Sequence, residues 1–328
     1  MRRILAMVGV AAAALFTSAS PAHAQFDGAR TYWPLPKNTN IVNGFYINGE
    51  ANASFSNFTS ITPNVDISSD VYMLSYTRVQ PLFGRSILWT GILPAATMST
   101  NSTLPLPTDD SFVNGLGDIT LGATINIFGA PEMMAYEWLR NDIGFVMWAG
   151  VNVTAPTGAY DSDQTLNVGS NQWKTRLSLP MIQSFGRWRP GERFTLEVTP
   201  TITFFSDNED APGGGSFEQD PMYSVEVHLT HDMTRDAYLS LDYTWLSGAE
   251  QTFYDSTGAL LNETDGIDAQ LIGATLGFQV NDNMSLHVTH MQALDESDGG
   301  VSLEGSVTKI RLTWAWHDVL QRVQDFGE

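Results

Sequence analysis

Four of the six histidines form two pairs with the same spacing, and histidine is the side chain best suited to metal or acid-base chemistry. His228 and His231 lie three residues apart, as do His287 and His290. Apolar and polar residues alternate around both pairs, which predicts strands, and residues three apart on a strand point to opposite faces. Neither pair can then supply two ligands to one zinc ion. We predict no metal site and no cofactor.

Nucleophilic catalysis has little support in this sequence. The chain contains no cysteine, which excludes a thiolate nucleophile, a thiolate metal site and a disulfide scaffold. It also contains no Gly-x-Ser-x-Gly elbow, although a Ser-His site is recognised by geometry that spacing alone does not reveal. We predict that the protein is not an enzyme, and a Ser-His hydrolase is the enzymatic alternative.

Alternation with a period of two is the strongest pattern in the chain, and it is clearest in residues 309–316 and 193–204. Between residues 71 and 80 the phase is ambiguous. Most of the alternating runs exceed the roughly 9 to 11 residues that a tilted strand needs to cross a bilayer. Their number is even, as expected for a closed barrel with both ends on one side. Twelve strands are predicted, at about 40–56, 67–80, 86–100, 113–128, 141–156, 171–186, 193–206, 219–231, 236–248, 264–279, 284–295 and 304–316.

The connections between these strands fall into two classes. Every second connection is mostly short and carries basic residues such as Arg85, Arg187 and Arg235. The others are longer, rich in Gly, Ser, Asp and Pro, and contain acidic residues but no Lys or Arg. Short periplasmic turns and long extracellular loops are typical of an antiparallel transmembrane β-barrel. Length and charge therefore predict the same two ends.

A secreted β-sandwich would also show alternation and polar loops. Tryptophans near the predicted strand ends favour the barrel, because aromatic girdles lie at both membrane interfaces. A closed sheet also leaves no unpaired edge in hydrocarbon. The girdle candidates are Trp148, Trp173, Trp188, Trp245, Trp314 and Trp316.

Charged residues on the polar phase of the strands are the candidates for function. A charge on the lipid face near the bilayer midplane costs about 2–4 kcal/mol, so these side chains are expected to line the lumen. They can form a constriction that selects solutes, or a salt-bridged plug that fills a narrow barrel. The candidates are Lys174, Arg176, Glu197, Glu226, His228, Asp242, His287, Lys309 and Arg311.

Net charge excludes a nucleic-acid binder, and the N-terminal leader predicts a location outside the cytoplasm. The formal net charge is −20, so the clustered Lys and Arg that a nucleic-acid binder needs are missing. Residues 1–24 read as a signal peptide, with Arg2 and Arg3, an apolar run and the cleavage site Ala22-His23-Ala24. We predict a periplasmic segment at 25–39, the barrel at 40–316 and a C-terminal extension at 317–328.

Five short strings, in order, carry a resemblance to a known family. They are residues 28–40 (GARTYWPLPKNTN), 74–82 (LSYTRVQPL), 115–122 (GLGDITLG), 155–161 (APTGAYD) followed by 167–173, and 228–232 (HLTHD). These strings resemble the bacterial outer-membrane family described as "putative MetA-pathway of phenol degradation". The resemblance implies a monomeric outer-membrane barrel associated with the degradation of phenolic compounds. One departure is the stretch after Trp316, because such barrels commonly finish at an aromatic strand.

We therefore predict an outer-membrane channel or transporter for small, hydrophobic or aromatic solutes, with the solute class resting on the resemblance. The alternatives are an outer-membrane hydrolase of the phospholipase type and a structural or surface-binding barrel with a plugged lumen. The expected partners are the lipid bilayer with its lipopolysaccharide, the outer-membrane assembly machinery, and a small hydrophobic or aromatic solute. No nucleic acid is expected.

Overall fold

A computed structural model describes residues 27–51, 65–102, 112–164, 166–211, 214–294 and 305–317. The predicted signal peptide (1–24) and nearly all of the C-terminal extension lie outside the described residues. The strands are β1 (Thr39–Ala51), β2 (Val65–Leu82), β3 (Arg85–Ser102), β4 (Phe112–Leu116), β5 (Thr120–Phe128), β6 (Phe145–Thr154), β7 (Lys174–Ser178), β8 (Met181–Phe185), β9 (Phe194–Phe205), β10 (Ser216–Gln219), β11 (Met222–Asp232), β12 (Ala237–Gly248), β13 (Gln251–Tyr254), β14 (Leu260–Thr264), β15 (Ile267–Asn281), β16 (Met284–Leu294) and β17 (Gly305–His317).

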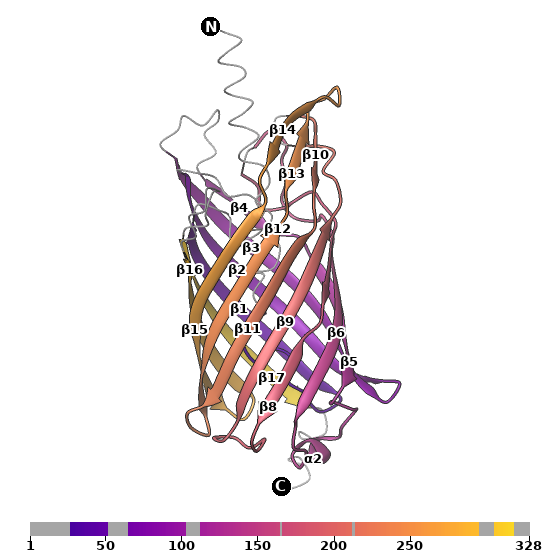
Figure 1. The fold of residues 1–328 in the computed structure, drawn as a ribbon, viewed down its shortest axis with the longest axis vertical. Coiled ribbons are helices and arrows are strands. Elements are labelled where there is room, and N and C mark those ends of the chain that lie inside the picture. Colours follow the sequence, from indigo (N-terminus) through magenta and orange to yellow (C-terminus); the bar gives the residue numbers. More distant parts are fainter. Residues whose placement is uncertain are drawn as a thin grey trace.

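The strands form a closed antiparallel barrel (Figure 1). Neighbours in sequence pair with one another, and β17 pairs with β1 from Thr39↔His317 to Ala51↔Gly305. The pairing of β9 with β11 completes the circle. Closure joins the first and last strands of the barrel, so the sheet has no open edge along its length. The predicted twelve-stranded all-β barrel is confirmed.

Two of the twelve predicted strands are each divided into two shorter pieces. The predicted strand 113–128 is interrupted between β4 and β5, and both pieces pair with β3. The predicted strand 171–186 is interrupted between β7 and β8 at Leu179 and Pro180. Proline has no N–H to donate to the ladder, and its carbonyl instead accepts a hydrogen bond from Trp148 N at 2.8 Å. Alternation alone did not reveal these breaks.

A second, three-stranded sheet stands at the long-loop end of the barrel, in the order β10-β13-β14 (Figure 1). Its strands lie in connections that we predicted as loops. Phe217 and Phe253 pair across β10 and β13, with ring centroids 5.4 Å apart, and are buried with Ala211. This small apolar cluster explains why the long loops here are folded rather than open.

At the opposite, short-turn end, the connection between β5 and β6 carries a one-turn helix, α2 (Ala135–Trp138). Glu137 accepts a hydrogen bond from Met134 N at 2.8 Å, which closes the first turn of this helix. Among the described residues, no helix is long and apolar enough to cross a membrane.

Side chains alternate between the lumen and the outer wall, as the pleat requires. In β9 and β17 the polar phase is inward and the apolar phase outward, as the sequence predicted. In β2, inward Val71 and Met73 alternate with outward Tyr72 and Leu74, so both faces are apolar. This explains the ambiguous phase of that segment.

Two apolar clusters lie inside the barrel, one near each end. The loop-side apolar cluster is formed mainly by inward residues of several strands, together with two residues that follow β6. Its buried members include Ile47, Met98, Leu166, Leu271 and Met291. The turn-side apolar cluster includes Val79, Val146, Trp148, Ile182 and Trp188. The charged residues of the lumen occupy inward positions between these two clusters.

Candidate functional site in the barrel lumen

Residues 27–38, called here the lumen segment, run inside the barrel toward its short-turn end. At the end of the segment, Lys37 N donates to Met133 O at 2.9 Å, and Trp138 Nε1 donates to Pro34 O at 2.8 Å. We predicted a periplasmic segment at 25–39, whereas the structure surrounds its described part with inward-facing side chains. The segment shows no alternation, so its position inside the lumen was not predictable from residue periodicity.

The beginning of the lumen segment is held by an acid and a base whose charged groups lie 3.8 Å apart, Glu226 and Arg176. The Arg176 guanidinium donates to both carboxylate oxygens of Asp27, at 3.1 and 2.9 Å. Glu226 accepts hydrogen bonds from Asp27 N at 3.0 Å and from Gly28 N at 3.2 Å. Charge-assisted bonds of this kind are about twice as strong as neutral ones.

One carboxylate also organises the middle of the segment. Glu197 Oε2 accepts from Arg30 N at 2.8 Å, and its Oε1 accepts from the indole N–H of Trp33, also at 2.8 Å. Arg30 has a φ of 63°, which is unusual for a residue with a Cβ. The hydrogen bond to Glu197 fixes this turn, and the turn directs the Arg30 side chain toward the short-turn end.

The Arg30 side chain lies in a cation–π and ion-pair cluster. Its guanidinium stacks over Trp33 at 4.1 Å and over Tyr238 at 3.6 Å from the ring centroids. It also forms an ion pair with Asp232 at 2.7 Å, and Arg193 Nε donates to the other oxygen of the same carboxylate at 2.7 Å. Because these groups are largely buried, removal of one charge would leave its partner uncompensated and would destabilise the fold.

The closing strand β17 also binds the lumen segment. Arg311 donates to Ala29 O and to Thr31 Oγ1, both at 2.9 Å. Arg311 further lies 3.1 Å from His287 Nδ1, which Tyr238 approaches to 2.6 Å. Docking of the segment therefore depends on Arg311 of β17, the strand that pairs with β1.

A second buried network of inward side chains lies beside Glu226. His228 Nδ1 is 2.7 Å from Asp242, and its Nε2 is 3.4 Å from Glu226. Asp242 also accepts hydrogen bonds from Ser240 and Thr275. His228 thus links the Glu226 carboxylate, which contacts the lumen segment, to the Asp242 carboxylate, which Ser240 and Thr275 hold in place.

The electrostatics of the segment follow from these contacts. Burial alone would raise the pKa of the Asp27 carboxyl, but the Arg176 guanidinium and hydrogen bonds from Arg176 and Tyr32 lower it below 3.8. For the Tyr32 hydroxyl, burial and the neighbouring Asp27 carboxylate raise the pKa well above 10. At neutral pH the segment therefore presents an ionised Asp27 and a neutral Tyr32.

The structure places all nine predicted charged residues at inward positions, and most of them contact the lumen segment or one another. Lys309 Nζ lies beside Gly28, 2.9 Å from where a Cβ would stand. The sequence analysis missed several partners because they lie in the segment or at strand ends. These are Asp27, Arg30, Trp33, Arg193, Asp232 and Tyr238.

The girdle prediction was wrong for two tryptophans. Trp148 (0% exposed) and Trp188 (8%) are buried in the turn-side apolar cluster, where Trp188 packs against Trp33 at 4.5 Å between ring centroids. Trp148 lies on the inward phase of β6, which the alternation did not identify. Trp173 and Trp314 are 55% and 50% exposed, and Trp245 and Trp316 are partly exposed.

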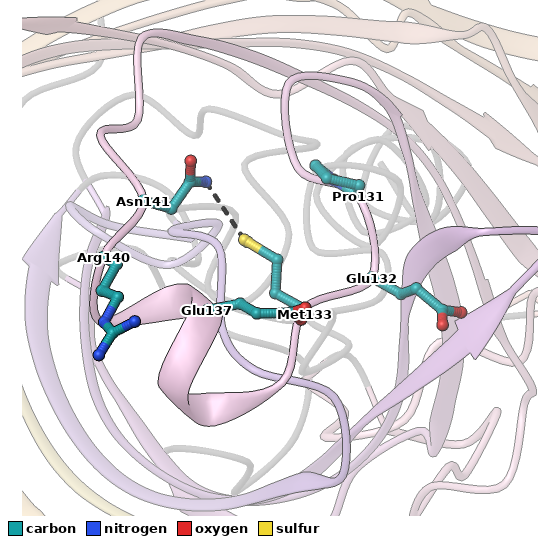
Figure 2. A pocket seen from close by; sticks show the side chains of 6 residues that line it. All are labelled: Pro131, Glu132, Met133, Glu137, Arg140 and Asn141. Carbon is teal, nitrogen blue, oxygen red and sulfur yellow. Dashed lines mark hydrogen bonds between the residues drawn. The ribbon is translucent and has the colours of Figure 1, made fainter.

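A pocket of about 370 Å³ lies at the short-turn end, beside the exit of the lumen segment (Figure 2). Residues of the α2 connection line it, among them Met133, Glu137 and Arg140. Asn141 Nδ2 donates to Met133 Sδ at 3.2 Å across this connection, and Lys37 forms an ion pair with Glu132 at 3.2 Å. The connection around α2 thus holds the end of the segment.

Similarity to a known protein family identifies the family of this chain. A model of the family described as "Putative MetA-pathway of phenol degradation" matches residues 49–306. The chain belongs to this family. The match covers most of the barrel, from the end of β1 to the start of β17. No curated protein matches the chain.

Two solved structures are similar in fold to this family member. The COG4313 outer membrane channel from Pseudomonas putida F1 is 20% identical, with 89% of this chain and 100% of that chain covered and a TM-score of 0.68. The transport unit of the autotransporter AIDA-I from Escherichia coli is 8% identical, covering 91% and 95%, with a TM-score of 0.51. At these identities the likeness concerns the fold alone.

The hydrolase alternative can be compared with the geometry of this phenol-degradation family member. Ser285 Oγ lies 2.9 Å from His287 Nε2, but the opposite ring nitrogen faces Tyr238 and Arg311 rather than a carboxylate. A catalytic triad needs an acid there to orient the histidine and stabilise its charge. Among the described residues, no group of three or more His, Asp or Glu could hold a metal ion.

Proposed function

We propose that the protein is an outer-membrane channel for small hydrophobic or aromatic solutes. The observation that carries this proposal is the loop-side apolar cluster inside the barrel. A channel for ions or sugars needs polar walls that replace hydration, whereas an apolar interior favours solutes that leave water readily. The phenol-degradation family description and the channel fold of the Pseudomonas putida relative agree with this role.

In this proposal the long loops face outward from the cell and the short turns face the periplasm, as in other outer-membrane barrels. Residues 1–24 would direct export and be removed. Cell fractionation and a heat-modifiable gel shift test both points. Recovery of the protein in the soluble fraction, without any shift, would overturn the membrane assignment.

In this proposal the solute path runs through the lumen, and the lumen segment closes the part of it that the inward charged residues line. A solute that enters the loop-side cluster must pass beside the segment or displace part of it. The same contacts also favour a second candidate, a barrel whose lumen is permanently plugged, because the segment is bound along its length. The two candidates differ in whether the full-length protein passes any solute.

A liposome assay separates these candidates. Liposomes that hold the purified protein are compared with protein-free liposomes for passage of phenolic compounds and of sugars. The channel proposal expects faster passage of the phenolic compounds and no gain for sugars. Equal passage of all solutes contradicts the proposed selectivity, and passage no faster than through protein-free liposomes favours the plugged barrel.

A further inference from the structure

The basic residues of the described strands are distributed unequally between the two faces of the barrel. Lys174, Arg176, Lys309 and Arg311 point into the lumen, whereas Arg78 and Arg85 lie on the outward phase of the β2–β3 hairpin. A cation on the lipid face costs about 2–4 kcal/mol at the bilayer midplane but only about 0–1 kcal/mol near an interface. Arg78 therefore marks the level of the interface at the short-turn end.

Arg78 lies in a row of outward side chains that crosses four neighbouring strands. The register pairs Trp316 with Asn40, Asn40 with Arg78, and Arg78 with Trp89. Asn40 Oδ1 accepts hydrogen bonds from Arg78 Nη1 and, at 2.8 Å, from the hydroxyl of Tyr76. Asn40 thereby positions the guanidinium on the wall between two indoles, in the place where aromatic side chains meet lipid headgroups.

The next outward row contains a notch. Tyr76 is paired with Gly91, which has no side chain, and the nearest neighbour to a Cβ at Gly91 would be Leu121 at 3.6 Å. Beyond Gly91, an apolar groove of about 250 Å³ opens on the outer wall, lined among others by Tyr72, Leu74, Leu93 and Leu116. Notch and groove follow the same strands, away from Arg78 and toward the long-loop end.

The dimensions of this surface fit an amphiphile with an anionic head. Leu74 is four residues from Arg78, so at about 3.3 Å per residue the groove begins about 13 Å from the guanidinium. A guanidinium binds phosphate through paired N–H donors, and an apolar groove accepts an acyl chain. A free phosphate would make no contact with the groove, and an uncharged hydrophobic solute would bring no anionic group to the guanidinium.

We propose that this surface is a binding site for a phospholipid of the periplasmic leaflet. Its phosphate contacts Arg78 between Trp89 and Trp316, and one acyl chain lies over Gly91 and in the groove that Leu74, Leu93 and Leu116 line. The site rests on the proposed outer-membrane location but not on transport of any solute. The bound lipid would fix the depth of this side of the barrel in the membrane.

Native mass spectrometry of the detergent-purified, full-length protein tests the site, with phosphatidylglycerol added as the probe and diacylglycerol as the phosphate-free comparison. We expect one phosphatidylglycerol per barrel to survive a detergent wash, and diacylglycerol to be retained on the order of tenfold less, the size of one charged hydrogen-bond contact. Arg78→Gln should lower phosphatidylglycerol retention by a similar factor, and Gly91→Leu should lower it by filling the notch.

Arg85→Gln is the matched control, because it removes the other outward arginine of the same hairpin and should leave retention unchanged. A heat-modifiable gel shift checks that each variant is folded, and a variant that fails it is replaced by Arg78→Lys or Gly91→Val. Equal retention in wild type, Arg78→Gln and Gly91→Leu would overturn the site, as would an equal loss in Arg85→Gln. Absence of the protein from membranes would instead overturn the proposed function.

Discussion

The loop-side and turn-side halves of the lumen differ in chemistry, although an apolar cluster lies near each end. The loop-side half is lined by apolar strand residues such as Met98, Leu271 and Met291, with Leu166 packed among them. The turn-side half contains the lumen segment, whose charges and backbone N–H groups meet Arg176, Glu226 and other inward side chains. Under the proposed function, the loop-side half provides affinity for apolar solutes, whereas the turn-side half provides the barrier.

The energetic scales of the two halves also differ. A buried charge that loses its partner destabilises a protein by about 3–5 kcal/mol. Loss of one buried methylene contact costs only about 0.8 kcal/mol. Substitutions in the turn-side half should therefore change stability and closure, and those in the loop-side half should mainly change which solute passes.

The largest effect is expected for Arg30→Met. This change removes the ion pair with Asp232 and leaves that carboxylate with Arg193 and the Gly191 N–H as partners, and it also removes the stacking on Trp33 and Tyr238, so the free energy of unfolding should fall by about 3–5 kcal/mol. Urea unfolding in detergent measures the change. Arg140→Met, at an exposed position of the α2 connection, is the matched control and should stay within about 0.5 kcal/mol of wild type.

A smaller effect is expected for Asp27→Asn. The asparagine keeps the shape of the side chain but loses the charge-assisted bonds to Arg176, so docking of the segment should weaken by about 1–3 kcal/mol. We expect a higher open probability in single-channel recordings. An unchanged open probability would mean that the Asp27 contact does not hold the segment in place.

The pH dependence of closure should follow the same carboxylate. Because the pKa of Asp27 is lowered below 3.8 in the folded protein, its contribution to docking is complete above 3.8 and is lost only as the pH falls through the folded pKa. Conductance of the wild type should stay flat from pH 7 to about 4 and rise below that range. In Asp27→Asn this acid rise should be reduced, and a wild-type rise already between pH 7 and 5 would contradict the assignment.

The smallest effect is expected in the loop-side half. Met291→Gln should reduce passage of phenolic compounds several-fold, because it replaces an apolar contact worth about 1–2 kcal/mol. Liposome passage rates provide the measurement. Thr289→Val, two residues along the same face of β16 and outside the cluster, is the comparison variant. Equal losses in both variants would argue against a distinct apolar region.

The sequence predicted the barrel well because alternation reports which face of a strand is polar. It placed Glu197, Glu226 and Arg311 at inward positions for that reason. The lumen segment was not predictable, since Asp27, Arg30 and Trp33 follow no period and their strand partners are 149, 167 and 164 residues away in the chain. Pairing of distant charges depends on closure of the barrel, which local patterns do not encode.

The apolar lining of the loop-side half was also hidden. A strand such as β2, with apolar residues on both faces, resembles a fully buried strand and loses its alternation. Trp148 and Trp188 show the same difficulty, because an interior tryptophan and a lipid-facing tryptophan look identical in sequence. The division of the lumen into two halves therefore emerged only from the arrangement of the strands.

Single-channel conductance of a protein that lacks residues 27–36, recorded beside the full-length protein, tests whether the lumen segment is the barrier. We expect the deletion to raise conductance at least about tenfold and to allow passage of sugars that the full-length protein excludes, because the segment occupies a narrow twelve-stranded lumen. The heat-modifiable gel shift must be preserved in the deletion. A folded deletion variant with the conductance of the full-length protein would contradict the claim that the lumen segment is the barrier.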